Sequence, residues 1–313
     1  MKGLIVFLFA LSLQTAAPKR DSVRILFWNL ENFFDWRNDS TSVSDQEFSS
    51  FGDRRWSKKK FNTKCQAVAK GILWIASQKG LPDIIGFAEV ENAFVLRRLV
   101  QTTALRKLDY KLVHFDSPDP RGIDVALLYR SSRLSFLEAK PCHLYNADST
   151  VMPTRDILLV RFDSLTVLVN HHPSKYGGAS VSNARRRVAV ERLKQVADSL
   201  QQIGVERIIA MGDFNDTPAN PLYRMLDPPL VNLAIPLFEK GEGTIKYEGV
   251  WELIDMFFVS PSCIPAKMEI ISIPFLLAPD SSHAGDKPLR TYSGPRHRGG
   301  VSDHCPIWLE LNI

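Results

Sequence analysis

Short apolar runs recur along the whole chain, and most are rich in the β-branched and aromatic residues typical of buried strands. They predict strands at 23–30, 83–90, 110–115, 125–129, 134–138, 157–162, 165–170, 207–211, 253–260, 268–273 and 306–311. Apolar residues at helical spacing predict helices at 57–78, 93–108 and 180–202, with a short helix around Leu222 and a polar loop at 278–300.

Some of the predicted strands are adjacent, which suits antiparallel hairpins, and others are separated by helices. A pair of mixed sheets with helices on the outside fits both observations, whereas a helical bundle or an all-β sandwich fits neither. Of the 313 residues, 45% are hydrophobic and 23% charged, a composition that excludes disorder, collagen and coiled coil. We therefore predict an α/β fold with a single large core.

The first seventeen residues, MKGLIVFLFALSLQTAA, have the layout of a secretory signal peptide. One cation, Lys2, precedes an apolar stretch that is too short to span a bilayer comfortably and is followed by small residues. We expect residues 1–17 to be removed and residues 18–313 to form a secreted or periplasmic domain, a monomer without a stable membrane anchor. The four cysteines have no zinc-binding spacing, and we expect most of them to be buried apolar residues.

Acids, amides and histidines follow directly after apolar strands throughout the chain. These residues are Asn29, Glu89, Asn170, His171, Asp213, Asn215, Asp255, Asp303 and His304. Ligand groups of open α/β folds gather at such strand ends. Asp and Asn also mark ordinary turns, but turn chemistry does not require Glu or His.

Glu89 ends a strand that should be buried on both faces, where an unpaired carboxylate costs several kcal/mol. A divalent cation would offset that cost. Oxygen ligands from Glu89, Asn29 and Asp303 suit Mg²⁺, Mn²⁺ or Ca²⁺ better than Zn²⁺. His171 and His304 are the candidates for proton transfer or charge stabilisation, and Asp124 and Asp255 are the candidate carboxylates that orient them.

Seven motifs in order resemble those of the endonuclease/exonuclease/phosphatase superfamily. They are WNLENFFD (28–35), GFAEVEN (86–92), RGIDVALLY (121–129), VNHHPSKYGG (169–178), GDFND (212–216), WELIDMFFVS (251–260) and SDHCPI (302–307). The resemblance implies a four-layer sandwich, in which two mixed sheets are flanked by helices, with one metal-dependent site at the rim.

By motif, Asn29, Glu89 and Asp303 match the metal-side residues of the superfamily, and His171 and His304 match its histidine pair. Asp213 and Asn215 match the phosphate and nucleophile pair. Asp255 matches the acid that orients His304, and Asp124 is a looser match for the partner of His171. The implied reaction is hydrolysis of a phosphoric ester by in-line attack of water, with His304 or Asp213 as the base.

The substrate is open at this level, because one fold hosts many activities. Net charge is only +5, but basic clusters at 54–64, 185–187 and 287–298 could contact nucleic-acid phosphates. Arg290 and Tyr292 could line the substrate entrance, and Lys175 is a further expected contact. We expect a nuclease or general phosphodiesterase. The alternatives are a phospholipid, sugar or inositol phosphate esterase, with 273–277 as a possible membrane wedge, and a catalytically silent binding protein.

Overall fold

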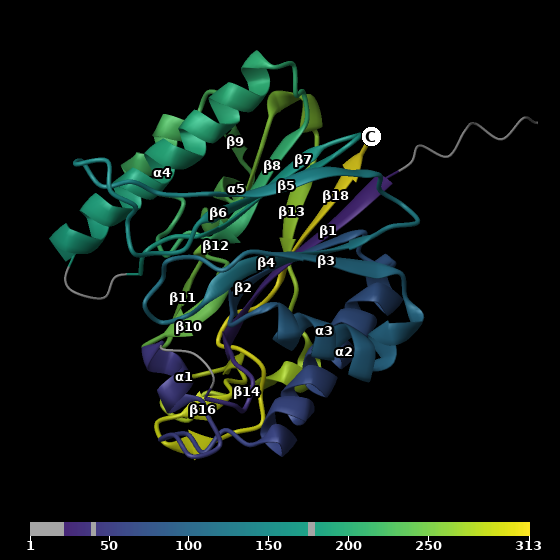
Figure 1. The fold of residues 1–313 in the computed structure, drawn as a ribbon, viewed down its shortest axis with the longest axis vertical. Helices are drawn as coiled ribbons and strands as arrows, with labels where there is room; N and C mark the ends of the chain where they lie inside the picture. The colour runs from purple at the N-terminus through teal and green to yellow at the C-terminus, as the bar shows by residue number, and fades with distance from the viewer. Residues whose placement is uncertain (1–21, 39–41, 175–178) are drawn as a thin grey trace, which may run out of the picture.

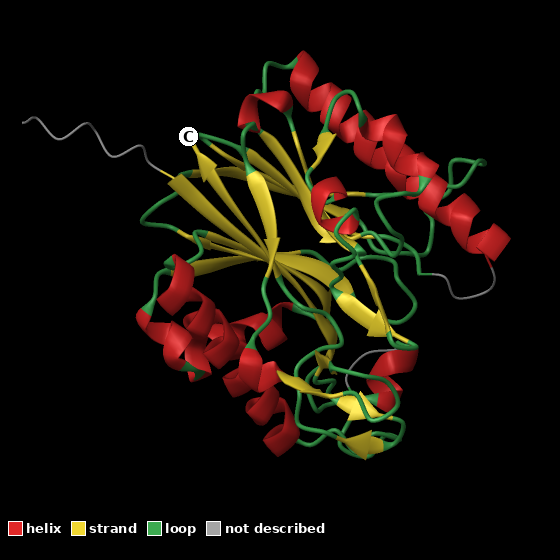
Figure 2. Ribbon diagram, turned by 180° about the vertical axis from the view of Figure 1, so that it is seen from behind, coloured by secondary structure: helices red, strands yellow, loops and turns green. Residues whose placement is uncertain are grey.

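Two six-stranded β-sheets pack face to face at the centre of the structure, a computed structural model that describes residues 22–38, 42–174 and 179–313. Helices cover the outer face of each sheet, which gives four layers (Figures 1 and 2). The prediction of two mixed sheets flanked by helices is confirmed.

The first sheet contains β1 (Ser22–Phe33), β2 (Ile84–Val90), β3 (Tyr110–His114), β4 (Asp124–Arg130), β13 (Lys267–Ile270) and β18 (Ile307–Asn312). The strand order is β13-β18-β1-β2-β4-β3. Only β1 and β2 pair in parallel, and the other neighbours are antiparallel.

The second sheet contains β5 (Phe136–Cys142), β6 (Ile157–Phe162), β7 (Thr166–His171), β8 (Ile208–Asp213), β9 (Val231–Asn232) and β12 (Asp255–Val259). The strand order is β5-β6-β7-β8-β12-β9, with β7 and β8 parallel. Each sheet therefore has one central parallel pair, and the carboxyl ends of these four strands point to the same rim.

Three long helices form the outer layers: α2 (Lys58–Lys79), α3 (Ala93–Thr102) and α4 (Ala179–Gln202). The first two pack on the first sheet, and α4 packs on the second (Figure 1). Short helical segments are α1 (Val43–Glu47), η1 (Ala104–Lys107), η2 (Pro221–Leu226), α5 (Ile235–Phe238), η3 (Pro261–Cys263) and η4 (Pro274–Leu276). Asn92 caps α3, because its Oδ1 accepts hydrogen bonds from the backbone N–H groups of Phe94 and Val95.

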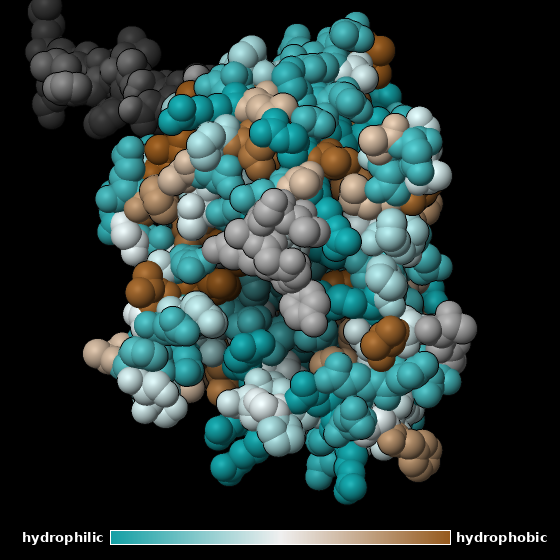
Figure 3. All heavy atoms as spheres, turned by 90° about the vertical axis from the view of Figure 1, so that its left-hand side faces the viewer, coloured by the Kyte–Doolittle hydropathy of each residue, from teal (hydrophilic) through white to brown (hydrophobic). Residues whose placement is uncertain are grey.

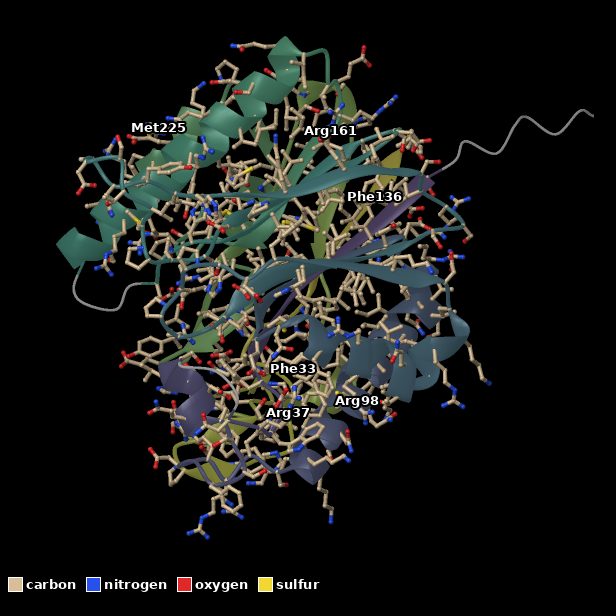
Figure 4. All side chains as sticks on the ribbon, in the orientation of Figure 1. Phe33, Arg37, Arg98, Phe136, Arg161 and Met225 are labelled. Atoms are coloured by element: carbon tan, nitrogen blue, oxygen red, sulfur yellow. The ribbon has the colours of Figure 1, made fainter. Side chains whose placement is uncertain are left out.

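Apolar side chains fill the spaces between the four layers. Phe33 of β1 stacks on Phe61 of α2 with ring centroids 5.7 Å apart, beneath the first sheet (Figure 4). Between the sheets, Phe136 of β5 stacks on Tyr129 of β4 at 5.8 Å (Figure 4). The two sheets pack closely at Gly86 of β2, where an added Cβ would lie 2.4 Å from the terminal methyl group of Met211 on β8.

Two predicted segments differ from the structure. The helix predicted at 93–108 ends at Thr102, because Thr103 is extended and its Oγ1 donates to the Leu99 carbonyl and accepts from Leu105 N–H. The loop predicted at 278–300 contains two small hairpins, β14 (Leu277–Pro279) with β15 (Asp286–Pro288) and β16 (Tyr292–Ser293) with β17 (Arg296–His297). Strands this short give no readable alternation in the sequence.

One further hairpin, β10 (Ile245–Tyr247) with β11 (Val250–Glu252), lies beside the loop before β18, where Ile245 forms a bridge to His304. All four cysteines are buried and free, as expected for apolar core residues. Within the described residues, none of the helices has the length and apolar character needed to cross a membrane. The expected signal peptide lies outside the described residues.

Candidate active site

The strand ends bring the predicted polar residues of both sheets to one rim. Pairing of β7, β8 and β12 sets His171 opposite Asp213, and Asp213 opposite Asp255. In the first sheet, Asn29 lies on β1, and its Nδ2 donates to Asp213 Oδ2 at 3.0 Å. This hydrogen bond joins the two sheets at the rim. Gly212 precedes Asp213 on β8, and a Cβ there would lie 2.2 Å from the carbonyl oxygen of Asn170 on the neighbouring strand β7.

His304 is held between two buried carboxylates. Its Nδ1 lies 2.8 Å from Asp255 Oδ2, while Nε2 is 3.9 Å from Asp213 Oδ2. The ring nitrogen Nδ1 therefore donates to Asp255, which fixes the orientation of the imidazole. The backbone of His304 is also held, because its N–H donates a hydrogen bond to Ser302 Oγ at 3.0 Å.

The two groups that face each other have shifted pKa values. Burial opposes the charge of His304, but the hydrogen-bonded Asp255, together with Asp213, raises the pKa of His304 well above its ordinary value. Burial raises the pKa of Asp213 to about 7, although the His304 cation pulls in the other direction. A cationic imidazole thus faces a carboxyl group that titrates near neutral pH, which is the range useful for proton transfer.

His171 is buried and neutral. Burial lowers its pKa well below the ordinary value, and the Arg155 and Arg121 cations add to the shift. Its Nε2 lies 3.6 Å from Asp213 Oδ2 and 3.9 Å from Glu89 Oε1. In the described chain its Nδ1 has no hydrogen-bond partner. As a neutral ring in this position, His171 can donate one hydrogen bond toward a ligand between Asp213 and Glu89.

Asp124 is not the partner of His171, and the predicted pairing is wrong. The Asp124 carboxylate lies 3.0 Å from His114 Nε2 and accepts hydrogen bonds from the backbone N–H and the hydroxyl of Ser117. The pairing follows from strand register, because β3 and β4 are antiparallel neighbours and His114 and Asp124 lie at the same end of that pair.

Asn215 and the adjacent histidine complete the Asp213 side. The Asn215 backbone N–H donates to Asp213 Oδ1 at 2.8 Å, and one of its two side-chain N–H groups donates to the His172 carbonyl at 2.9 Å. Within the described residues the second N–H has no partner, so it can donate to a ligand at the rim. The His172 ring instead packs on Phe214, with centroids 4.7 Å apart, so it lies apart from the reacting groups.

Several site residues have a strained backbone. Seven non-glycine residues in the described chain have positive φ, and four of them are Glu31, Asn32, Glu89 and Asn215. Glu89 sits at an irregularity of the β2 pairing, which turns its side chain out of the ladder. Strain of this kind persists where the surrounding structure enforces it, and it is concentrated at functional sites.

The predicted metal-side residues fit a hard divalent cation. Glu89 Oε2 accepts from Asn32 N–H at 2.8 Å, but Oε1 forms no hydrogen bond in the described chain, although the side chain is only 14% exposed. In the part of the chain that the structure describes, Asn29 Oδ1 accepts one hydrogen bond, from Glu31 N–H, which leaves a lone pair. Among the described residues, two groups have ligand atoms within 4.8 Å of one another: Asp213 with Asp255 and His304 at this rim, and His114 with Asp116 and Asp124.

Asp303, the third predicted ligand, is tied into an ion-pair network that the sequence did not reveal. Arg290 bridges two acids, with Nη2 3.1 Å from Asp303 Oδ2 and Nε 2.9 Å from Glu31 Oε1. Lys64 is buried in the same network and donates to the Glu31 carbonyl and to Thr291 Oγ1. Burial raises the pKa of Glu31 to about 7 and lowers that of Lys64 to about 8.

Several other residues that were expected to contact the substrate are buried in the structure. Tyr292 is buried, and its hydroxyl donates to the Arg54 carbonyl at 2.8 Å. Arg186, in the cluster 185–187, is also buried and lies 3.2 Å from Asp216. Neither Lys64 nor Arg186 is free to contact nucleic acid. Lys175 lies outside the described residues.

Arg121 is a site residue that the sequence reasoning missed. Its Nη2 donates to Asn32 Oδ1 at 3.0 Å and lies 3.7 Å from Glu89 Oε1. The side chain is 41% exposed, so it can reach a ligand at the rim. Its place at the start of the RGIDVALLY motif was the available signal, as was the place of Glu31 inside WNLENFFD.

A sequence profile of the endonuclease/exonuclease/phosphatase family matches residues 24–313. The chain belongs to this family. Members are metal-dependent hydrolases of phosphoester bonds, so the chain is a metal-dependent hydrolase that acts on ester bonds. A comparison with curated protein sequences finds no match.

Solved structures with the same fold include the following three. A family member from Bacteroides thetaiotaomicron has a TM-score of 0.59 and 16% identity, covering 93% of this chain and 97% of its own. D. rerio TDP2 complexed with single-strand DNA product has a TM-score of 0.53 and 16% identity, covering 93% and 99%. A mannosyl-6-phosphatase from Bacteroides thetaiotaomicron has a TM-score of 0.57 and 15% identity, covering 93% and 100%. At these identities the likeness establishes the fold alone.

Proposed function

We propose that this chain is an exported, Mg²⁺-dependent phosphodiesterase that cleaves nucleic acids. The observation that carries the proposal is the position of Asp213, whose Oδ2 is met by Asn29 from the other sheet and faced by both His171 and His304. A carboxylate with these neighbours suits hydrolysis of a phosphate ester better than binding alone. Export rests on the signal-like segment 1–17.

Asp213 takes the proton of the attacking water in this mechanism. Hydrogen bonds from Asn29 and from Asn215 N–H orient its carboxylate, and its pKa of about 7 suits a base at neutral pH. Water oxygen attacks phosphorus in line, the P–O bond to the leaving group breaks, and the leaving oxygen takes up a proton from solvent. His304 already carries a proton, which makes it the weaker candidate for the base.

The other polar groups bind and stabilise the phosphoryl oxygens. Cationic His304 balances negative charge, while the neutral His171 and the free N–H of Asn215 donate hydrogen bonds. A divalent cation held by Glu89, Asn29 and Asp303 would supply further charge stabilisation of the transferred group. Mg²⁺ is proposed because all three side chains offer oxygen ligands.

Nucleic acid is preferred over lipid because of two surface features. The segment 273–277 is not a membrane wedge: Ile273 and Leu276 are buried, and Phe275 packs edge-on against Trp74. Beside the site, by contrast, the loop 287–298 presents Arg298, an exposed cation suited to a phosphate backbone. TDP2, a fold neighbour, is described with a DNA product, which is consistent with this choice.

A substrate panel tests the proposal. The purified chain is assayed with Mg²⁺ on single-stranded DNA, supercoiled DNA, RNA, sphingomyelin, an inositol phosphate and mannose 6-phosphate. Cleavage of a nucleic acid, with at least about a hundredfold loss in Asp213→Ala, is the expected result. Turnover of sphingomyelin, the inositol phosphate or mannose 6-phosphate alone would replace the nuclease proposal with a lipid or sugar-phosphate esterase.

A further inference from the structure

A basic pocket of about 440 Å³ lies next to the catalytic rim, within the size range of about 300–1,000 Å³ typical of ligand sites. The hairpin segment after η4 forms one wall, and the end of β1 and the loop after α1 form the other. Its lining includes Phe48, Arg54, Lys287, Arg290, Tyr292 and Arg298. On the face shown in Figure 3, the lower part, over α1 and these hairpins, is mostly hydrophilic.

The pocket and the catalytic centre share a wall. Glu31 and Asn32 line the pocket, and the backbone N–H of Asn32 donates to Glu89 on the other side. Arg290 likewise lines the pocket and contacts Asp303, next to His304. A group bound in the pocket would therefore be close to a phosphate held at the catalytic centre.

The pocket walls are held by internal hydrogen bonds, so the cavity is built before a ligand arrives. Tyr292 hydroxyl donates to the Arg54 carbonyl, and Lys64 donates to Thr291 Oγ1 at 2.8 Å. A Cβ on Gly300 would lie 1.8 Å from the carbonyl oxygen of Leu289, so only glycine fits beside this wall of the pocket. A preformed pocket binds its ligand with a smaller cost for ordering side chains and loops.

Positive charge dominates the pocket lining, and one of the cations forms no ion pair within the described residues. Four cations against one acid, Glu31, give a formal charge of 4 − 1 = +3. Lys287 pairs with Asp280, and Arg54 pairs with Glu47 through Nε. Arg298 is exposed and its side chain forms no ion pair or hydrogen bond in the described chain; only its backbone N–H is bonded, to the Thr291 carbonyl.

We propose that this pocket binds a second phosphate group of the substrate, adjacent to the phosphate that is cleaved, with Arg298 as its main contact. A planar guanidinium with unused donors is well suited to a phosphate. The inference rests on the proposed function for the identity of the substrate, and it adds a reason for the enzyme to prefer substrates with at least two phosphates.

The test compares the binding of bisphosphates and monophosphates by calorimetry with Mg²⁺ present. Thymidine 3′,5′-bisphosphate should bind at least about tenfold more tightly than either thymidine monophosphate, because a tenfold difference in affinity is the scale of one charged hydrogen bond. Arg298→Ala should remove that difference. Arg296→Ala is the matched control, because Arg296 is an exposed arginine of the same hairpin that does not line the pocket. Fructose 1,6-bisphosphate is compared with its monophosphates in the same way. If only this sugar gains affinity from the second phosphate, the pocket proposal is supported but the pocket is assigned to a sugar phosphate.

Hydrolysis of bis-p-nitrophenyl phosphate, which has one phosphate, separates this inference from the proposed function. Arg298→Ala should leave that hydrolysis within about twofold of wild type. If bisphosphates gain nothing, or if Arg298→Ala and Arg296→Ala act alike, the pocket proposal is overturned even though the enzyme cleaves phosphodiesters. If the bisphosphate gain is present but no phosphodiester is cleaved, the pocket stands and the proposed function fails.

Discussion

Asp255 holds His304 in place through a 2.8 Å contact between Oδ2 and Nδ1, and the opposite edge of the imidazole faces Asp213 at 3.9 Å. The first contact fixes the orientation of the ring and keeps it cationic, and the second places that charge where a phosphoryl group would bind. The acid, the histidine and the second acid come from β12, the loop before β18 and β8, so the arrangement exists only in the assembled sandwich.

Asp255→Asn should lower kcat by about a hundredfold or more with little change in KM, because an asparagine cannot keep His304 charged. Steady-state kinetics on bis-p-nitrophenyl phosphate measure both constants. Asp156→Asn is the control, since Asp156 makes a similar 2.9 Å contact with His143 away from the site. Equal losses in the two variants would show a general effect on folding.

Asp213→Asn should stabilise the metal-free protein, and more so at higher pH. Burial raises the folded-state pKa of Asp213 to about 7, above the unfolded value of about 3.9, so its contribution to stability is present at low pH and is lost as pH rises toward 7. In EDTA, the Tm of the variant should exceed that of wild type by several degrees at pH 8 and by less at pH 5. A difference that does not change with pH would contradict the shifted pKa.

Glu89→Gln should raise the Mg²⁺ concentration needed for half-maximal activity by at least about tenfold, because it removes the carboxylate whose Oε1 has no hydrogen bond in the described chain. Metal titration of initial rates measures the shift. Glu138→Gln, at the surface ion pair with Arg161, is the control and should have no effect. An unchanged metal requirement in Glu89→Gln would exclude Glu89 as a ligand.

Asp124→Asn should reduce stability but leave kcat within about threefold of wild type. Its carboxylate contacts His114 and Ser117, whereas the family motif suggested an interaction with His171. Thermal unfolding and kinetics on the same preparation separate the two effects. A loss of a hundredfold in kcat with a native Tm would restore the catalytic role.

The main strands, the long helices and the rim residues could be predicted from sequence because each is a local pattern: apolar runs, helical spacing, and polar residues after strands. Side-chain pairs that depend on the register of two strands could not be predicted from sequence. His114 and Asp124 pair across two strands, and no spacing in the chain indicates that. Burial of Lys64, Arg186 and Tyr292 was equally hidden, because a basic or aromatic residue in a polar segment looks like a surface contact until the neighbouring loop is placed.

The most direct test of the account is release of p-nitrophenol from bis-p-nitrophenyl phosphate by the purified chain with Mg²⁺, measured before and after chelation. We predict steady turnover with Mg²⁺, complete loss in EDTA, recovery on adding Mg²⁺ back, and at least about a hundredfold loss in both Asp213→Ala and His304→Ala. Undiminished activity after exhaustive chelation, or near wild-type activity in both variants, would contradict the assignment of this site.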